Sequence, residues 1–533
     1  MNGNPTGSDI EDAGYKPELK RTLSSFQMFA ISFASVSVVI GVFSTYDDVL
    51  RNSGPVGIWL FPIVAVGQIL VALVYAQFAA RIPLSGSSYQ WASRLANPKI
   101  GWIFGWIAVW NVGLSPVAVD NALASQCLMP LFNMAPSEVT ARVITVILLV
   151  IQAIIVIAST RIVGWTNSLA VGVELAIVVV LGIALVVAVI LTGHGSTHNL
   201  VSQGIAEGAP NYFALGGGLM AALIMGLSTL VGFDASANMA EEAKDPHRSV
   251  PRAIVGSVVA AAVLGMLLII ALTVAITDMG RVSASDSPVA EIMRDQFGPG
   301  LERPFLLVIA IAFFGAAVVS MAATARIIFA MARDRRLPAH GLLKKVNPRT
   351  QTPIWATLFV LAVGIVLMMV MPGGALLQLI LAGAILTNIP YAMTIVLYLV
   401  VRRKLEHKQG AFDLGRFELP VAVVALVWVL AAMTIVIASS ATVVPILIVV
   451  GLLLAGGVYF AYLMKFQRHV LEHEPGKADP LEPAHSTSTQ SEAGEDPGED
   501  LGLVFELGIA PDRALVGAGT GFGAKEDRAP GHR

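Results

Sequence analysis

The chain has 533 residues, of which 56% are hydrophobic and only 13% are charged. A soluble domain carries about 25% charged residues, so this composition, with repeated apolar stretches of about 18 or more residues, predicts a polytopic membrane protein. The formal net charge of -2 gives no sign of a nucleic-acid-binding protein. The single cysteine, Cys127, lies in an apolar stretch and can form no intrachain disulfide.

Residues 1–24 lack the apolar core of a signal peptide, so we expect them to remain as a cytoplasmic N-terminal tail. A transmembrane domain over residues 25–468 follows, with about twelve apolar spans. The expected spans begin near residues 27, 57, 101, 140, 167, 214, 253, 305, 354, 376, 418 and 442.

The first span is rich in small residues, among them Ser35, Ser37 and Gly41. Ser37, Gly41 and Ser44 share one face of a helix. Small residues at such spacings let membrane helices pack closely, and the same hydroxyl groups can also line a site between the helices. Both interpretations stay open at this point.

The third and the fifth spans each contain an acidic residue that is a candidate for function. Glu174 lies about 10 Å beyond the start of the fifth span. Burial favours the neutral form of a carboxyl group, so Glu174 is a candidate proton carrier; the alternative is a hydrogen bond between helices with no transport role. Asp120 in the third span is a weaker candidate, because Asn111 and Ser115 nearby predict a partly polar helix in which an acid merely meets water.

The sixth span is interrupted by Gly232, Phe233 and Asp234. A charged residue inside a membrane span is a functional candidate by default. If the helix breaks there, the freed amides and carbonyls need water, ions or a ligand, because lipid cannot bond to them. The alternative is that Asp234 caps a finished span, since residues 214 to 234 cover roughly 30 Å as a helix.

Lys and Arg residues fall in alternate connections between the spans. We count about 24 of them on one side of the membrane, both termini included, against about five on the other. The positive-inside rule therefore predicts that both termini are cytoplasmic. The five outer residues are Arg51, Arg142, Arg281, Arg294 and Arg303.

Residues 469–533 are rich in Pro, Ser, Glu and Gly and predict a disordered cytoplasmic C-terminal tail. The chain contains no nucleophile elbow, P-loop, paired-cysteine motif or histidines at metal-ligand spacing. We therefore expect neither an enzyme nor a bound cofactor or metal, and we expect the energy for any transport to come from a gradient.

Three motifs resemble a known superfamily. FDASANMAEEAKDPHRSVPRAI, from Phe233 to Ile254, resembles the segment between the broken sixth helix and the seventh helix of amino acid-polyamine-organocation permeases. ARIIFAMARDRRLPA, from Ala325 to Ala339, resembles the end of their eighth helix. TNIPYA, from Thr387 to Ala392, is similar to the tenth helix of the amino acid-choline transporter branch. The resemblance covers roughly residues 20–468.

This resemblance implies an all-α membrane protein of the leucine-transporter type, in which two inverted repeats of five spans are followed by two further helices. It also implies that helices 1 and 6 are broken at the midplane. Many members of the superfamily carry Gly-x-Gly in the first span, whereas this chain has Ser35-Val36-Ser37, so the register of the first break is open by a residue or two.

The broken helices together predict a substrate site. We expect the substrate carboxylate near Ser35, Ser37 and Gly41, because helix N-termini favour anions. Gly232 belongs to the second break. By the resemblance, Phe233 forms a hydrophobic lid. Asp234 is expected to hold an ammonium group; the alternative is that it is protonated or paired with a protein cation such as Lys244, and then it shapes the helix and contacts nothing transported.

The predicted function is that of a secondary transporter that imports an amino acid or related amine across the cell membrane by proton symport. Sodium coupling, exchange of polyamine or choline-like cations, and a receptor on the same scaffold are the alternatives. A channel is disfavoured because no repeated filter or ring of charges is visible in the sequence.

Overall fold

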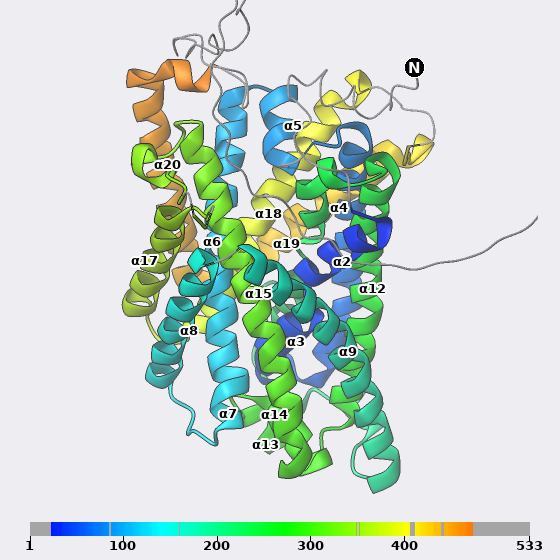
Figure 1. Ribbon diagram of the computed structural model, residues 1–533. Coiled ribbons are helices and arrows are strands. Elements are labelled where there is room, and N and C mark those ends of the chain that lie inside the picture. Colours follow the sequence, from blue (N-terminus) through cyan, green and yellow to red (C-terminus); the bar gives the residue numbers. More distant parts are fainter. Residues whose placement is uncertain are drawn as a thin grey trace, which may run out of the picture. The chain divides into compact units, whose positions relative to one another are not determined.

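The computed structural model describes residues 23–84, 87–158, 160–347, 349–350, 352–405, 411–438 and 442–472. Most of the predicted N-terminal tail, and the C-terminal tail beyond residue 472, lie outside the described residues. Apart from one isolated bridge between Leu23 and Ala243, every regular element within these ranges is a helix. The long helices lie side by side (Figure 1).

The apolar helices follow the order that the sequence predicts. Eleven of the described segments are long and apolar enough to cross a membrane, and α17 is an apolar helix of 17 residues at the position of the ninth predicted span. The main helices of these segments are α2 (Ser25–Val36), α3 (Val38–Asn52), α4 (Leu60–Arg81), α6 (Pro98–Ala122), α8 (Glu138–Ala158), α9 (Thr160–Thr192), α11 (Leu223–Thr229), η5 (Phe233–Glu242), α12 (Pro246–Val274), α15 (Pro299–Arg333), α17 (Ile354–Val370), α18 (Ala375–Val401), α19 (Glu418–Ala438) and α20 (Val443–Phe466).

Short helices complete these segments and their connections. They are η1 (Pro55–Trp59), α5 (Ser87–Leu95), η2 (Leu123–Leu128), α7 (Met129–Leu131), η3 (Thr197–Val201), η4 (Gly204–Ala206), α10 (Gly218–Ala221), α13 (Met279–Ala284), α14 (Pro288–Phe297), α16 (His340–Leu343), η6 (Arg402–Lys404), η7 (Gly415–Phe417) and η9 (Arg468–Leu471). The last of these crosses residue 469, the predicted start of the tail, and Leu471 is buried.

The connecting helices mark two opposite ends of the bundle. α5, which follows the second span, lies at the upper end in Figure 1, and α13 and α14, which follow the seventh span, lie at the lower end. Short helices after the second and seventh spans, on opposite sides, are what an inverted repeat of five predicts. We call the end with α5 the inner end and the end with α13 and α14 the outer end, after the predicted sidedness.

The first and sixth spans are both broken, as predicted. Ser37 separates α2 from α3 and has φ 42° and ψ 83°, in the left-handed region that few residues other than glycine adopt. In the sixth span α11 ends at Thr229 and η5 begins at Phe233, with Gly232 at φ 82°. Because η5 continues to Glu242, Asp234 lies at the start of the second half of the broken sixth helix and does not cap the end of a finished span.

The enclosed and peripheral spans differ in how much side-chain surface they bury. α12 packs against α2 and α4, and α15 packs against α6 and α9. α18 is largely enclosed, whereas α20 exposes most of its apolar side chains. Such an apolar outer surface suits contact with lipid, because hydrocarbon does not penalise exposed leucine or valine.

Candidate substrate-binding site

The two breaks lie against each other. A Cβ atom placed on Gly232 would come 2.7 Å from the carbonyl oxygen of Ser35, so this close approach requires glycine. On the α2 side of the first break, Ser32 Oγ lies 2.7 Å from the carbonyl oxygen of Phe233 and 2.7 Å from Ser236 Oγ. The unwound segments of helices 1 and 6 therefore form one continuous site.

The breaks expose helix termini of both partial charges, positive and negative. The first amides of α3 and most of the last carbonyls of α2 and α11 lack a partner within their own helix, although Phe33 O and Gly226 O accept the amides of Ser37 and Leu230. Helix N-termini carry partial positive charge and C-termini partial negative charge, so α3 presents the positive end and α2 and α11 present negative ends. A solute with a carboxylate and an ammonium group fits this arrangement.

Three aromatic rings pack around the second break. Phe233 is fully buried and stacks on Tyr391, with ring centroids 5.0 Å apart. It also meets Tyr75 edge-on, at 5.8 Å and 90°. The amide of Gly232 donates to the hydroxyl of Tyr391 at 3.1 Å. The sequence predicts a lid at Phe233, and the structure places this side chain in an aromatic cluster beside the break.

Asp234 lies in the first turn of η5 and is partly exposed. The hydroxyl of Tyr391 is its polar side-chain neighbour, and Tyr75 is close enough to feel its charge. Among the described residues no ion pair joins Asp234 to a cation, Lys244 included. The pairing of Asp234 with Lys244, which the sequence leaves open, is therefore not seen in the described part of the chain.

The remaining predicted residues of the first span have different surroundings. Ser35 is exposed, and its hydroxyl donates to the carbonyl oxygen of Ile31 at 3.0 Å. Gly41 is buried, and a Cβ atom there would overlap Thr229 on α11. The amide of Gly41 already donates to the carbonyl oxygen of Ser37 at 3.1 Å. Gly41 thus fits the close-packing interpretation, whereas Ser35 and Ser37 border the break.

Glu174 on α9 reaches the first break. Its carboxyl group neighbours the Ser37 hydroxyl and the backbone amides of Val38 and Val39, at the positive end of α3. Glu174 is 4% exposed. Neither Glu174 Oε1 nor Ser37 Oγ has a hydrogen-bond partner among the described residues. An acid in this place interacts directly with the unwound part of helix 1.

Asp120, the weaker candidate, is buried away from these breaks. Gln152 Nε2 on α8 donates to Asp120 Oδ1 at 2.6 Å. The contact joins the third and fourth spans, and both side chains are fully buried. Asp120 is thus part of a hydrogen bond between helices and is shielded from bulk solvent, and the interpretation that it merely meets water stays untested.

Comparison with known proteins identifies the family. Residues 23–451 match the amino acid permease family over most of the chain. The chain belongs to this family. It thereby belongs to the amino acid-polyamine-organocation superfamily, as its motifs predict, while its assignment to the choline branch stays a prediction.

Curated relatives of the permease are transporters, not enzymes. Amino-acid permease BAT1 of Arabidopsis thaliana is 28% identical over 455 residues, which cover 79% of this chain and 86% of the relative. The GABA-specific permease of Saccharomyces cerevisiae is 26% identical and covers 77% of this chain and 74% of its own length. A Candida albicans protein named as a polyamine transporter is 24% identical, with 78% of each chain covered.

A solved structure gives the same fold. The manganese transporter of Eremococcus coleocola superposes with a TM-score of 0.51, over 85% of this chain and 99% of its own. At 13% identity this likeness shows the fold alone. It agrees with the all-helical, leucine-transporter-type fold that the sequence predicts for the permease.

Sequence reasoning missed three residues that line the candidate site: Ser32, Tyr75 and Tyr391. Tyr391 lies in the TNIPYA motif, which served only to recognise the superfamily. A tyrosine beside a proline inside an apolar span is a signal that deserved a functional interpretation. Nothing in the local pattern distinguishes Ser32 or Tyr75, because their partners lie more than 150 residues away in the chain.

Proposed function

We propose that this permease is a secondary active transporter that imports an amino acid or related amine across the cell membrane in symport with protons. The observation that carries the proposal is the contact between two unwound breaks, with Glu174 at one and Asp234 at the other. Transporters with broken helices bind their substrates at such breaks, where helix termini and free peptide groups contact the ligand.

The amine end of the solute binds at Asp234. The carboxylate adds a full negative charge to the partial charges of the α11 carbonyls. In a site largely shielded from water, a paired ammonium group is held more strongly than in solution. The GABA-specific permease and the polyamine transporter among the relatives are named for solutes that share a cationic nitrogen, which supports this choice of substrate class.

The carboxylate end of the solute binds at the N-terminus of α3, and Glu174 explains the coupling. Two carboxylates at one helix terminus repel each other, so the solute carboxylate binds best when Glu174 is protonated. Proton uptake and substrate binding then strengthen each other by the same factor, because linkage between two sites is reciprocal. This is the thermodynamic requirement of a symporter.

Uptake of radiolabelled γ-aminobutyrate into proteoliposomes tests the proposal. In sodium-free buffer, an inward proton gradient should drive accumulation in the wild type. The variant Glu174→Gln mimics the protonated acid, so it should still bind and exchange the solute but should no longer accumulate it. A strict sodium requirement, or accumulation by the variant at the wild-type level, contradicts proton coupling through Glu174.

The charge of Asp234 is tested separately. Asp234→Asn keeps the size of the side chain and deletes its charge. We expect weaker binding of amine solutes in a competition panel between roughly pH 5 and 8, with the protein still folded. Unchanged affinity over this range contradicts the role of Asp234 as counter-ion, and the absence of saturable counterflow contradicts transport itself.

A further inference from the structure

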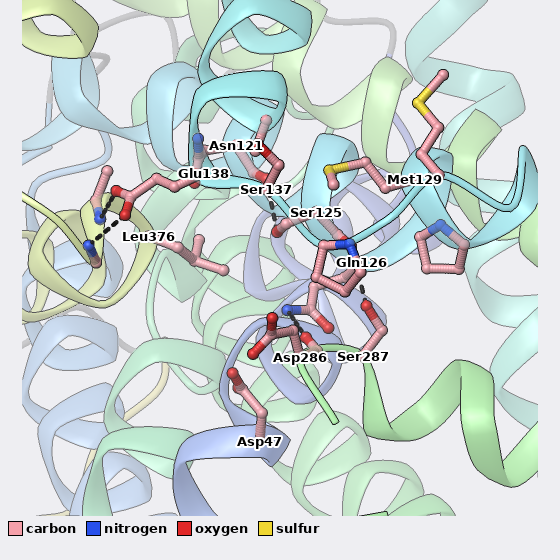
Figure 2. Close-up of a pocket in the computed structure, with 16 residues that line it drawn as sticks. Asp47, Asn121, Ser125, Gln126, Met129, Ser137, Glu138, Asp286, Ser287 and Leu376 are labelled. Carbon is pink, nitrogen blue, oxygen red and sulfur yellow. Dashed lines mark hydrogen bonds between the residues drawn. The ribbon is translucent and has the colours of Figure 1, made fainter. Parts of the chain in front are cut away.

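A cavity lies at the outer end of the bundle, away from the two breaks. It has a volume of about 230 Å³ and is bounded by α3, η2 and α7, α8, the connection between α13 and α14, and the start of α18. Asp47 rises from α3 toward Asp286 on the α13–α14 connection (Figure 2). Because α3 begins at the first break, Asp47 stands about 15 Å outward from Ser37 along the same helix.

Negative charge exceeds positive charge around this cavity. Arg51 pairs with Asp286 at 2.5 Å, and Arg142 pairs with Glu138 at 2.8 Å. Among the described residues Asp47 has no ion-pair partner of its own, although it feels the charge of Arg51. Three carboxylates of the lining, Asp47, Glu138 and Asp286, thus lie beside two guanidinium groups.

Asp47 also has an unused acceptor. Asp47 Oδ1 is buried and has no hydrogen-bond partner among the described residues. A buried carboxylate oxygen without a donor is costly, so a cationic donor in the cavity would remove this cost.

The opposite wall of the cavity is held in place by hydrogen bonds. Gln126, 3% exposed, donates to the carbonyl oxygen of Asp286 at 2.8 Å. Ser287 Oγ donates to the carbonyl oxygen of Ser125 at 3.0 Å. The Glu138 carboxylate accepts hydrogen bonds from the amides of Gly374 and Ala375, at 2.9 and 3.0 Å. These hydrogen bonds fix the positions of Asp286 and Glu138 at the cavity.

We propose that this outer cavity binds the primary ammonium group of a small organic amine before it reaches the central site. Asp47 and Asp286 accept the charge-assisted hydrogen bonds of the ammonium group. The carbon chain of the amine lies against Met129, Met134 and Leu376, which form the apolar part of the lining. The choice of an amine rests on the proposed function; the existence of a cation site rests on the charges and the free oxygen of Asp47.

A metal ion fits the cavity less well. Within the described ranges, no group of three or more His, Cys, Asp or Glu side chains is arranged to hold a metal. An apolar wall also offers nothing to a hydrated ion, whereas it buries the methylene groups of an amine.

Equilibrium binding of radiolabelled putrescine to the purified full-length protein tests this inference. The measurements use an Asp234→Asn background, which disables the central amine site. In that background Asp47→Asn should weaken putrescine binding by about tenfold or more, because the cavity loses its free carboxylate. Asp48→Asn is the matched control: it makes the same substitution one residue further along α3, outside the lining, and should weaken binding by less than about threefold.

Three results would overturn the inference. The first is equal putrescine binding by the Asp234→Asn protein with and without Asp47→Asn. The second is an equal loss of binding in the Asp47 and Asp48 variants, which indicates a general charge effect. The third is displacement of putrescine by manganese at lower concentration than by unlabelled putrescine, which indicates a metal site. A protein that fails to accumulate any amine but keeps Asp47-dependent putrescine binding contradicts the proposed function and leaves this inference standing.

Discussion

At the scale of single residues, Ser37 shows how this chain differs from the pattern it resembles. Ser37 adopts a left-handed conformation at the first break, which costs an L-residue about 1–2 kcal/mol relative to glycine. The resemblance places Gly-x-Gly near this point in many permeases. The Ser37 hydroxyl lies next to Glu174, and we expect it to act on that carboxyl group.

We expect Ser37→Gly to raise the thermal unfolding temperature or leave it unchanged, because glycine removes the strain of the left-handed conformation, worth about 1 kcal/mol. Ser37→Ala keeps the strain and deletes the same hydroxyl. Both variants should shift the pH dependence of uptake equally if the hydroxyl serves Glu174. A larger loss of stability in the glycine variant than in the alanine variant would contradict this account.

Tyr391 is the second residue whose role can be isolated. Tyr391→Phe keeps the ring that stacks on Phe233 but leaves the Gly232 amide without its acceptor, a loss of about 1–3 kcal/mol for a buried group. Apparent affinity for an amine substrate should fall by about tenfold in competition uptake assays. Tyr459→Phe on α20 is the control and should behave as the wild type; equal affinity in both variants would argue against a role for the Tyr391 hydroxyl.

At the scale of elements, the two outer half-helices meet through a glycine contact. α3 approaches α11 so closely at Gly41 that any side chain there would overlap Thr229. Gly226 on α11 packs in the same way against Val64 on α4. These contacts fix the outer halves of the broken helices within the bundle by shape, since small residues are what allow membrane helices this proximity.

Gly41→Ala should therefore lower the stability of the permease by about 1–3 kcal/mol through overpacking. Gly451→Ala on α20 is the matched control, because a Cβ atom there meets nothing within 4 Å. Thermal unfolding in detergent measures both variants. If the two substitutions have the same effect, the close contact between α3 and α11 does not determine stability.

At the scale of the whole described bundle, charge distinguishes the two ends. Four of the five arginines predicted to lie outside form ion pairs, and these pairs are Arg51–Asp286, Arg142–Glu138, Arg281–Glu291 and Arg294–Glu302. The many basic residues of the other end are expected to remain in the cytoplasm. The orientation of the bundle is a prediction that labelling can test.

Cys127 is fully buried, so a cysteine-free background is obtained with Cys127→Ser. In intact cells a membrane-impermeant maleimide should label Ala284→Cys on α13, which is exposed at the outer end. Lys404→Cys on η6 is exposed at the inner end and should react only after permeabilisation. Labelling of Lys404→Cys in intact cells would reverse the predicted orientation.

The sequence predicts the spans and the second break well and the site less well. Apolar runs and Gly-Phe-Asp are local signals, and the structure has both features at the expected places. The first break lies at Ser37, where the backbone is left-handed. The sequence Ser-Val-Ser does not predict this conformation. Tyr75, Tyr391 and Asp47 gain their roles from partners on distant helices, and no local pattern reveals such contacts.

The hydrogen bonds of Ser32 have a mechanical consequence. They join α2 to η5, and the amides of Leu23 and Lys244 add two further links, to Glu242 O and Leu23 O, both at 3.0 Å. The inner halves of the two broken helices are thus tied into one body, while α3 and α11 are locked together at Gly41. Rotation about Ser37 alone would break these contacts, so we expect the two breaks to move together as a single hinge.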